Sequence, residues 1–242
     1  MKNEASLTAP AAGTHVSRGG EESLFRQTLA REHRLGLYVD GAPFAQLVCT
    51  PSQLRELVLG RLCTAGRIAV QEDVLSLTFS DAEDRADICI CPGAVRASAQ
   101  PPTDRSAWRR EDIFLLAGCL PSSMPLHDAT MGTHGCLLLH RGEILCCCED
   151  IGRHNAIDKA VGTALTRGIP LNECVLYTTG RIAVDIVEKT VTAGVPVLVS
   201  RTLPTAEAVA LAETRGLTLI GRAWEAQYEV FTRPCCAKHD RA

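Results

Sequence analysis

The strongest constraint on the fold is an alternation of strand-like and helical patterns in the C-terminal half of the chain. Each helical pattern carries apolar residues on one face and ends at a glycine. The strand-like runs are 175–179, 195–200 and 217–221. The helical patterns are 154–167, 181–193 and 204–216. Strands that alternate with helices of this length predict a layered α/β domain with a largely parallel sheet.

The segment before this domain predicts a small α+β lobe. Thr50 is expected to cap a helix, with Pro51 in its first position and Gln53 completing a capping box. The expected buried stripe of this helix is Leu54, Leu57, Val58 and Leu62. The expected strands of the lobe lie within 35–50, 73–79 and 86–90.

Changes in composition and pattern divide the chain into five parts. The expected parts are a mobile N-terminal arm (1–34), the small α+β lobe (35–91), a linker rich in Pro, Ala and Ser (92–110), the α/β domain (111–234) and a tail (235–242). The α/β domain is expected to open with a hairpin made of 135–140 and 143–149.

The overall composition is that of a folded protein. Of the 242 residues, 46% are hydrophobic and 22% are charged, and the net charge of −3 predicts no affinity for nucleic acid or an anionic membrane. No apolar run has the roughly 18 to 20 residues of a membrane span. The first twenty residues lack the apolar core of a secretion signal, so we expect a cytoplasmic protein.

Twelve cysteines are many for a cytoplasmic chain, and most are expected to be small buried hydrophobes. No two of them have the C-x-x-C spacing of a zinc site. A zinc deaminase would need H-x-E and P-C-x-x-C. His134 is followed by Gly-Cys and Pro234 by only Cys235-Cys236, so we expect no deaminase site and no bound metal.

An arginine follows each of four predicted strands, and in α/β sheets the ligand crevice lies beyond the carboxyl ends of the strands. These residues are Arg153, Arg181, Arg201 and Arg222. Guanidinium groups beside helix starts suit phosphate or pyrophosphate, although solvated loop arginines are the alternative. Two residue pairs lie nearby, Glu149-Asp150 and Asp158-Lys159. An acidic pair there could receive a guanine edge or orient Arg153. Alternatively, Asp150 could cap the following helix, and Asp158 with Lys159 could lie on its solvated face.

Two long runs carry a family resemblance. The run EDIGRHNAIDKAVG (149–162) and the segment 178–223 resemble the FdhD family, the formate dehydrogenase accessory sulfurtransferases. The segment 35–68 resembles the first lobe of that family, and Thr133-His134-Gly135 resembles its T-H-A stretch. The similarity extends over roughly residues 35 to 232, and the motif E-D-x-G-R-H-N-A-x-D-K is long and specific.

The resemblance implies a cytidine-deaminase-like C-terminal domain without deaminase chemistry, and a homodimer. It implies that sulfur is accepted from a cysteine desulfurase as a cysteine persulfide. The sulfur is then passed to the molybdenum bis(molybdopterin guanine dinucleotide) cofactor of formate dehydrogenase, which is handled rather than permanently bound. The implied contacts to this cofactor are Arg153, His154, Asn155, Gly180, Arg181, Arg201, Gly221, Arg222, Ala223, Trp224, Glu225, Ala226 and Gln227.

The loop that carries the sulfur-accepting cysteines in the family has a different pattern in this chain. The family has C-G-x-C-G where this chain has Cys89-Ile90-Cys91-Pro92-Gly93. A persulfide carrier needs an exposed thiolate. Cys91, ahead of Pro-Gly, is therefore the expected carrier, with Cys89 as its companion and Cys119 as a further candidate.

Two other functions stay open at this point. One is a cofactor-binding chaperone of the same fold that has lost sulfur transfer. The other is a redox or metal sensor that uses the cysteine-rich strand 143–149.

Overall fold

The expected α/β domain is built on a six-stranded sheet. The computed structural model describes residues 7–94 and 108–233. The strands are β7 (His134–His140), β8 (Glu143–Asp150), β9 (Cys174–Thr178), β10 (Val197–Ser200), β11 (Thr218–Gly221) and β12 (Glu229–Thr232), in the order β12-β11-β10-β9-β7-β8. Parallel pairing joins only β9 with β10 and β10 with β11 among the described strands of this sheet. The sheet is therefore mixed rather than largely parallel, because β7, β8 and β12 run antiparallel to their neighbours.

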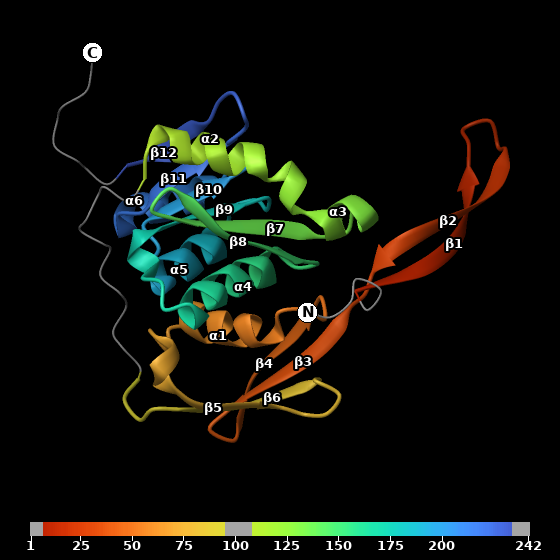
Figure 1. Cartoon of the computed structure of the whole chain (residues 1–242). Helices are drawn as coiled ribbons and strands as arrows, with labels where there is room; N and C mark the ends of the chain where they lie inside the picture. The colour runs from red at the N-terminus through yellow and green to blue at the C-terminus, as the bar shows by residue number, and fades with distance from the viewer. Residues whose placement is uncertain (1–6, 95–107, 234–242) are drawn as a thin grey trace, which may run out of the picture.

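Helices cover both faces of this sheet (Figure 1). The helices of the domain are α2 (Arg110–Cys119), α3 (Pro125–Thr130), α4 (Arg153–Thr166), α5 (Val184–Ala193) and α6 (Ala206–Arg215). Apolar residues of α4, α5 and α6 pack on one face, and those of α2 pack on the other. Short 3-10 helices are η2 (Gln71–Asp73), η3 (Pro121–Ser123) and η4 (Leu171–Glu173).

The N-terminal lobe is a four-stranded sheet with one helix. Its elements are β3 (His33–Val39), β4 (Ala42–Cys49), α1 (Leu54–Thr64), β5 (Val74–Phe79) and β6 (Arg85–Ile90), with the strand order β4-β3-β6-β5. The helix α1 lies between this sheet and α4, so the layers follow one another from α2 down to the small sheet (Figure 1). The expected buried stripe of α1 is confirmed, since all four of its residues are buried.

The predicted start of α1 is wrong by three residues. The helix begins at Leu54, and Gln53 before it has a left-handed φ of 51° and makes no capping bond with its side chain. Thr50 is not the cap, because its amide and its hydroxyl both donate to Asp150 Oδ2 at 3.0 Å. A contact with a residue one hundred positions away thus replaces the expected local cap.

The two lobes meet through a direct backbone contact between α1 and α4. A Cβ atom added to Gly60 would overlap the carbonyl oxygen of Asp158, and one added to Gly162 would overlap the carbonyl oxygen of Glu56. Glycine is therefore required at both positions by the close approach of the two helices. Buried residues of both lobes form one continuous hydrophobic cluster around this contact.

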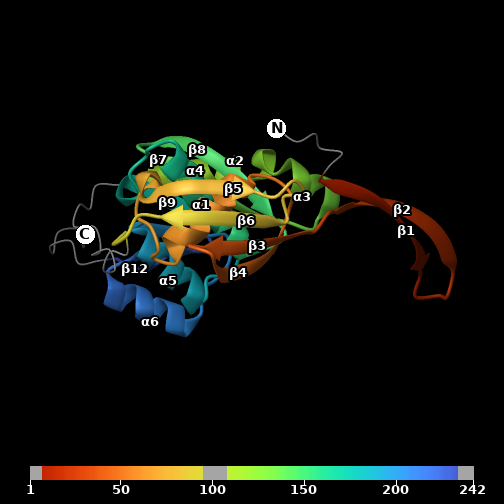
Figure 2. The same cartoon turned by 90° about the horizontal axis from the view of Figure 1, so that it is seen from below.

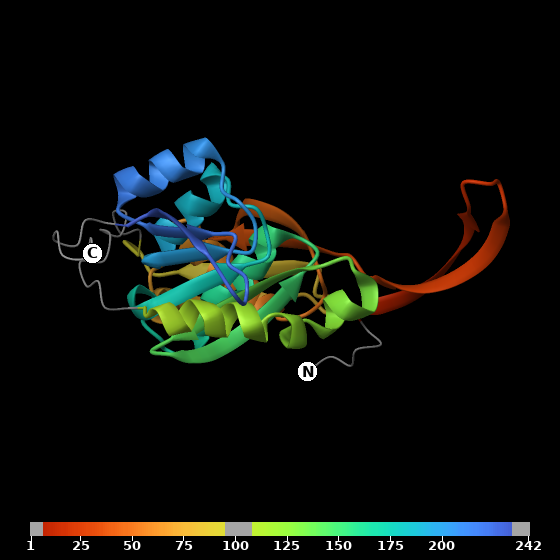
Figure 3. The ribbon, with the colours of Figure 1, turned by 90° about the horizontal axis from the view of Figure 1, so that it is seen from above.

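The segment expected to be a mobile arm, residues 1–34, contains two regular strands. Residues of β1 (Thr8–Val16) and β2 (Glu22–Ala30) pair in an antiparallel hairpin that projects from the body of the molecule (Figures 2 and 3). Nearly all residues of the hairpin are at least partly exposed, including Leu24. With no buried face, the strands carry no apolar alternation that a sequence pattern could reveal.

The predicted linker 92–110 falls largely outside the described residues, and the predicted tail 235–242 falls wholly outside them. Within 7–94 and 108–233, no helix is long and apolar enough to cross a membrane.

The glycine contact predicts opposite effects for chemically identical substitutions. Gly60→Ala or Gly162→Ala should lower the free energy of unfolding by at least about 2 kcal/mol, because the added methyl pushes two helices apart. Gly118→Ala, in α2, is the control, because a Cβ atom at Gly118 would meet no other atom within 4 Å. This substitution should raise the free energy of unfolding by up to about 1 kcal/mol, since alanine favours a helix more than glycine does. Urea unfolding of the three variants measures both effects. Equal effects at Gly60 and Gly118 would contradict the contact.

Candidate functional site

The four arginines lie at one edge of the large sheet. Strands β8, β9, β10 and β11 run in the same direction, so their carboxyl ends meet there. We call the segments that follow them the strand-end loops; they comprise residues 150–155, 179–182, 201–205 and 221–227. Arg153 lies in the first of them and is the first residue of α4. The structure thus brings together the loops that the sequence singles out.

Hydroxyl and backbone bonds tie three of these loops to one another. Ser200 Oγ donates to the Gly180 carbonyl at 2.8 Å and accepts from the Thr202 amide at 2.9 Å. The amides of Arg222 and Ala223 donate to the carbonyls of Thr202 and Ser200 at 3.0 Å. The loops are therefore braced by bonds that do not depend on the arginine side chains.

Arg153 has an unsatisfied donor at this edge. A Cβ atom on Gly180 would lie 2.9 Å from Arg153 Cβ, so the arginine stem packs directly over the glycine backbone. Its Nε atom is buried and has no hydrogen-bond partner among the described residues. Buried donors normally find a partner, and an anion at the edge would supply one.

The last strand-end loop presents an aromatic surface. The Arg201 guanidinium stacks 4.3 Å from the centre of the Trp224 ring, which is 44% exposed. The Trp224 amide donates to the Gln227 carbonyl at 2.8 Å and closes the turn. Arg222 has a left-handed φ of 44° and pairs with Glu229 at 3.3 Å.

The remaining predicted contacts on these loops divide into two groups. Arg181, Glu225, Ala226 and Gln227 are exposed, whereas Gly180, Gly221 and Ala223 are buried in the turns. The exposed group is free to reach a ligand with its side chains. The buried group shapes the backbone.

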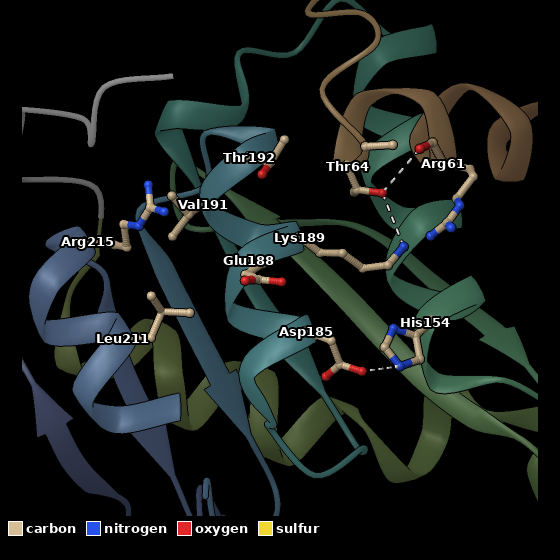
Figure 4. A pocket seen from close by; sticks show the side chains of 11 residues that line it. Arg61, Thr64, His154, Asp185, Glu188, Lys189, Val191, Thr192, Leu211 and Arg215 are labelled. Atoms are coloured by element: carbon tan, nitrogen blue, oxygen red, sulfur yellow. Dashed lines mark hydrogen bonds and ion pairs between the residues drawn. The ribbon is translucent and has the colours of Figure 1, made fainter. Parts of the chain in front are cut away.

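Two other predicted contacts turn away from this edge. His154 Nε2 lies 3.1 Å from Asp185 Oδ2 and lines a 480 Å³ groove with Arg61 and Lys189 (Figure 4). Burial lowers the pKa of His154, with the charge of Asp185 opposing the shift. Asn155 is buried and donates to Asp150 Oδ1 at 2.9 Å and to the Val48 carbonyl at 2.7 Å.

The acidic residues of the long motif are structural. Asp150 and Lys159 form an ion pair of 2.7 Å whose side chains are both 0% exposed. Lys159 also donates to Thr50 Oγ1 at 2.6 Å. Asp158 accepts from Lys189, a residue of α5, and from the hydroxyl of Thr64 in α1 at 2.7 Å. Both carboxylates therefore hold the lobes together rather than face a ligand.

Glu149 is also engaged within the fold. Its carboxylate accepts from the amides of Leu126 and His127 at 3.0 and 2.6 Å and from the Thr133 hydroxyl at 3.0 Å. This carboxylate therefore satisfies free amides at the start of α3. The expected helix cap and solvated face are both wrong, because Gly152 is the N-cap residue of α4 and Asp158 and Lys159 are buried in ion pairs.

Sequence reasoning missed His134 as part of this edge. Its Nδ1 atom lies 3.4 Å from Thr179 Oγ1, in the second strand-end loop. Burial lowers the pKa of His134, and the charges of Arg153 and His127 act in the same direction. The signal is its place at the start of β7, because this strand runs antiparallel to β9 and its start therefore lies beside the end of β9. From its sequence pattern, the only chemical role suggested for His134 was that of a zinc ligand.

Cys89 and Cys91 lie at the end of β6. Cys89 lies inside the strand but is exposed, because it alternates with the buried Ile88 and Ile90. Cys91 is half-buried, with its amide bonded to the Asp73 carbonyl at 2.8 Å and its thiol 3.7 Å from the Glu72 carbonyl. Cys119, the further candidate, is half-buried at the end of α2.

The structure does not bring Cys91 and the strand-end loops together within one chain. The start of β3 pairs with Cys49, next to the Thr50–Asp150 contact, whereas its other end pairs with Ile88. The seven residues of β3 separate these ends by roughly 20 Å. Cys91 follows β6 at the far end of the small sheet (Figure 1).

Comparison with known proteins identifies relatives over most of the chain. The model of the FdhD/NarQ family matches residues 89–236. A sulfur carrier protein FdhD from Mycolicibacterium paratuberculosis is 31% identical, covering 91% of this chain and 95% of the relative. Another from Halalkalibacterium halodurans is 30% identical, covering 85% and 87%.

A solved structure shares the fold. The crystal structure of a formate dehydrogenase accessory protein from Desulfotalea psychrophila superposes with a TM-score of 0.82 at 26% identity, covering 94% of this chain and 98% of that one. The family match spans the large domain with the strand-end loops, and the relatives extend it over the small lobe. The chain therefore belongs to the FdhD/NarQ family.

Proposed function

We propose that this protein is a cytoplasmic sulfurtransferase that serves a formate dehydrogenase. It accepts sulfur from a cysteine desulfurase as a cysteine persulfide and passes it to the molybdenum bis(molybdopterin guanine dinucleotide) cofactor. The cofactor is cargo and is not retained. The names of the relatives, sulfur carrier proteins and a formate dehydrogenase accessory protein, support this proposal. We also propose that the layers of the large domain are those of a cytidine deaminase without its chemistry.

The observation that carries the proposal is the cationic edge formed by the strand-end loops. Arg153 offers a buried donor that has no hydrogen-bond partner within residues 7–94 and 108–233, at the N-terminus of a 14-residue helix. A helix N-terminus and a guanidinium both stabilise phosphate oxygens. Arg181 is exposed beside it, and Trp224 offers an exposed ring on which a guanine could stack. A guanine dinucleotide carries both groups that such an edge would bind.

Replacing Arg153 and Arg181, each of which follows a glycine, should weaken the binding of GDP, a fragment of the proposed cargo. Arg153→Ala with Arg181→Ala should raise the dissociation constant at least tenfold, since each charge-assisted hydrogen bond contributes about 1.5–3 kcal/mol. Calorimetry on the full chain measures the change. The control is Arg85→Ala with Arg141→Ala, which removes the same charge from two exposed ion pairs elsewhere. Equal affinities in the two double variants would exclude this placement.

Cys91 is the proposed sulfur carrier, with the exposed Cys89 as its neighbour. The Cys91 thiolate attacks the outer sulfur of the desulfurase persulfide. A new sulfur–sulfur bond forms on Cys91, the donor bond breaks, and the donor cysteine leaves as a thiolate. For this attack the thiol must release its contact with the Glu72 carbonyl.

Sulfur should therefore appear on the tryptic peptide 86–96, which contains both cysteines. After incubation with a cysteine desulfurase and cysteine, peptide mass spectrometry should find one added sulfur atom on Cys91. Cys91→Ala should abolish this adduct, and Cys119→Ala should leave it unchanged. An adduct on this peptide that persists in Cys91→Ala would assign the role to Cys89 instead.

A homodimer is the proposed assembly, and β8 supports it. This strand lies at the edge of the large sheet and has only one strand neighbour. Its residues from Ile144 to Cys147 are apolar and partly exposed. An apolar edge strand favours pairing with another chain, and a twofold axis would let two copies of β8 pair with each other.

The alternative proposal is a chaperone that binds the cofactor but transfers no sulfur. The roughly 20 Å that β3 places between Cys91 and the strand-end loops favours this alternative. The two functions differ in one result, because a chaperone would bind GDP and accept no sulfur from the desulfurase.

A further inference from the structure

A groove of 480 Å³ lies between helices α1, α4, α5 and α6 (Figure 4). This volume is within the range of sites that hold small molecules. Of the eleven residues that line the groove, His154 alone belongs to a strand-end loop. Figure 4 shows Arg61, His154 and Lys189 together at one end, and the apolar side chains of Val191 and Leu211 at the other. Such a groove suits a ligand with one charged end and one apolar end.

Arg61 brings an unsatisfied donor to the charged end. Its Nε atom is buried and has no hydrogen-bond partner within residues 7–94 and 108–233. Among the same residues, no carboxylate pairs with its guanidinium. Buried donors normally have a partner, and the parallel N–H groups of a guanidinium match the two oxygens of a carboxylate. A carboxylate from solution would therefore satisfy Arg61.

Lys189 adds a second positive charge beside Arg61. Its Nζ atom donates to both carboxylate oxygens of Asp158 and to Thr64 Oγ1 at 3.2 Å, so its three donors are in use. Burial lowers the pKa of Lys189, and the positive charge of Arg61 acts in the same direction. The two cations therefore repel each other, and the carboxylate of Asp158 is engaged by Lys189 and Thr64. An anion in the groove would offset this repulsion.

The acidic residues of the groove limit the charge of its ligand. Asp185 is exposed and lies 3.1 Å from His154 Nε2. Glu188 is also exposed, and it has no hydrogen-bond or ion-pair partner in the part of the chain that the structure describes. Both carboxylates repel an anion, and they repel a dianion more strongly than a monoanion. A carboxylate is therefore favoured over a phosphate.

We propose that this groove binds a small monocarboxylate with an apolar chain. The carboxylate accepts hydrogen bonds from Arg61, beside the charge of Lys189. The apolar chain lies against Val191 and Leu211. The site goes beyond the proposed sulfur transfer, because it uses neither Cys91 nor the arginines of the strand-end loops.

NMR titration of the full chain with sodium acetate and with sodium hexanoate, at constant ionic strength, tests the site. Both salts should shift the Arg61 Nε–H signal and the backbone amide signals of Ala65 and Thr192, which line the groove. Hexanoate should bind at least tenfold more tightly than acetate, because its four additional CH₂ groups become buried. Equal dissociation constants would overturn the apolar end of the site.

Substitutions on two sides of the groove should have opposite effects, read from the same amide signals. Arg61→Gln should raise the dissociation constant of acetate at least tenfold, because charge-assisted hydrogen bonds are lost. The matched control is Arg55→Gln, which removes the same charge from an exposed position of α1 and should change nothing. Glu188→Gln, also at an exposed position, should tighten acetate binding severalfold. Equal affinities in the variants at Arg61 and Arg55, or no gain in Glu188→Gln, would overturn the site.

Inorganic phosphate distinguishes a monocarboxylate site from a general anion site. In the double variant Arg153→Ala with Arg181→Ala, phosphate should shift the groove signals only at higher concentrations than acetate does. Tighter binding of phosphate would overturn the monocarboxylate assignment. No shift with either carboxylate would overturn the site as a whole, and it would leave the proposed function intact, since GDP binding and persulfide formation are measured at other residues.

Discussion

The contact of α1 with α4 at Gly60 and Gly162 is the constraint on which the rest of the structure depends. It brings two helix backbones together without intervening side chains, and this fixes the distance between the lobes. Polar groups of α1, α4 and α5 can then form buried bonds across the contact. Asp158, Thr64 and Lys189 do so directly beside the glycines. A buried charge is tolerated only when it is paired, so each of these groups reinforces the close approach.

The long motif at 149–159 consequently has two faces with different tasks. Its inner face holds the lobes, through the buried pair of Asp150 and Lys159 and the amide of Asn155. Its outer face presents Arg153 over Gly180 at the sheet edge. The same helix therefore anchors the small lobe and aims a donor at the strand-end loops. Loss of the inner bonds would displace the outer residue, so stability and the proposed ligand binding would change together in this segment.

Sequence patterns could predict the strands β7 to β11 and the helices α4, α5 and α6, because these strands are short apolar runs and each of these helical patterns ends at a glycine. They could also predict the convergence of the arginines, since this follows from strand direction. They could not predict that Thr50 bonds to Asp150, a partner one hundred residues away, instead of capping α1. His154 and Asn155 adjoin Arg153 in sequence, but helical geometry turns them toward a groove and the small lobe. The hairpin 8–30 buries no face and leaves no pattern.

The central claim is the proposal that the strand-end loops bind the phosphates of a guanine nucleotide. A crystal structure of the full chain soaked with GDP tests it most directly. The account predicts the diphosphate between Arg153 and Arg181, with a phosphate oxygen bonded to Arg153 Nε and the guanine against Trp224. GDP in the groove lined by Arg61 and Lys189, with the strand-end loops empty, would contradict the claim.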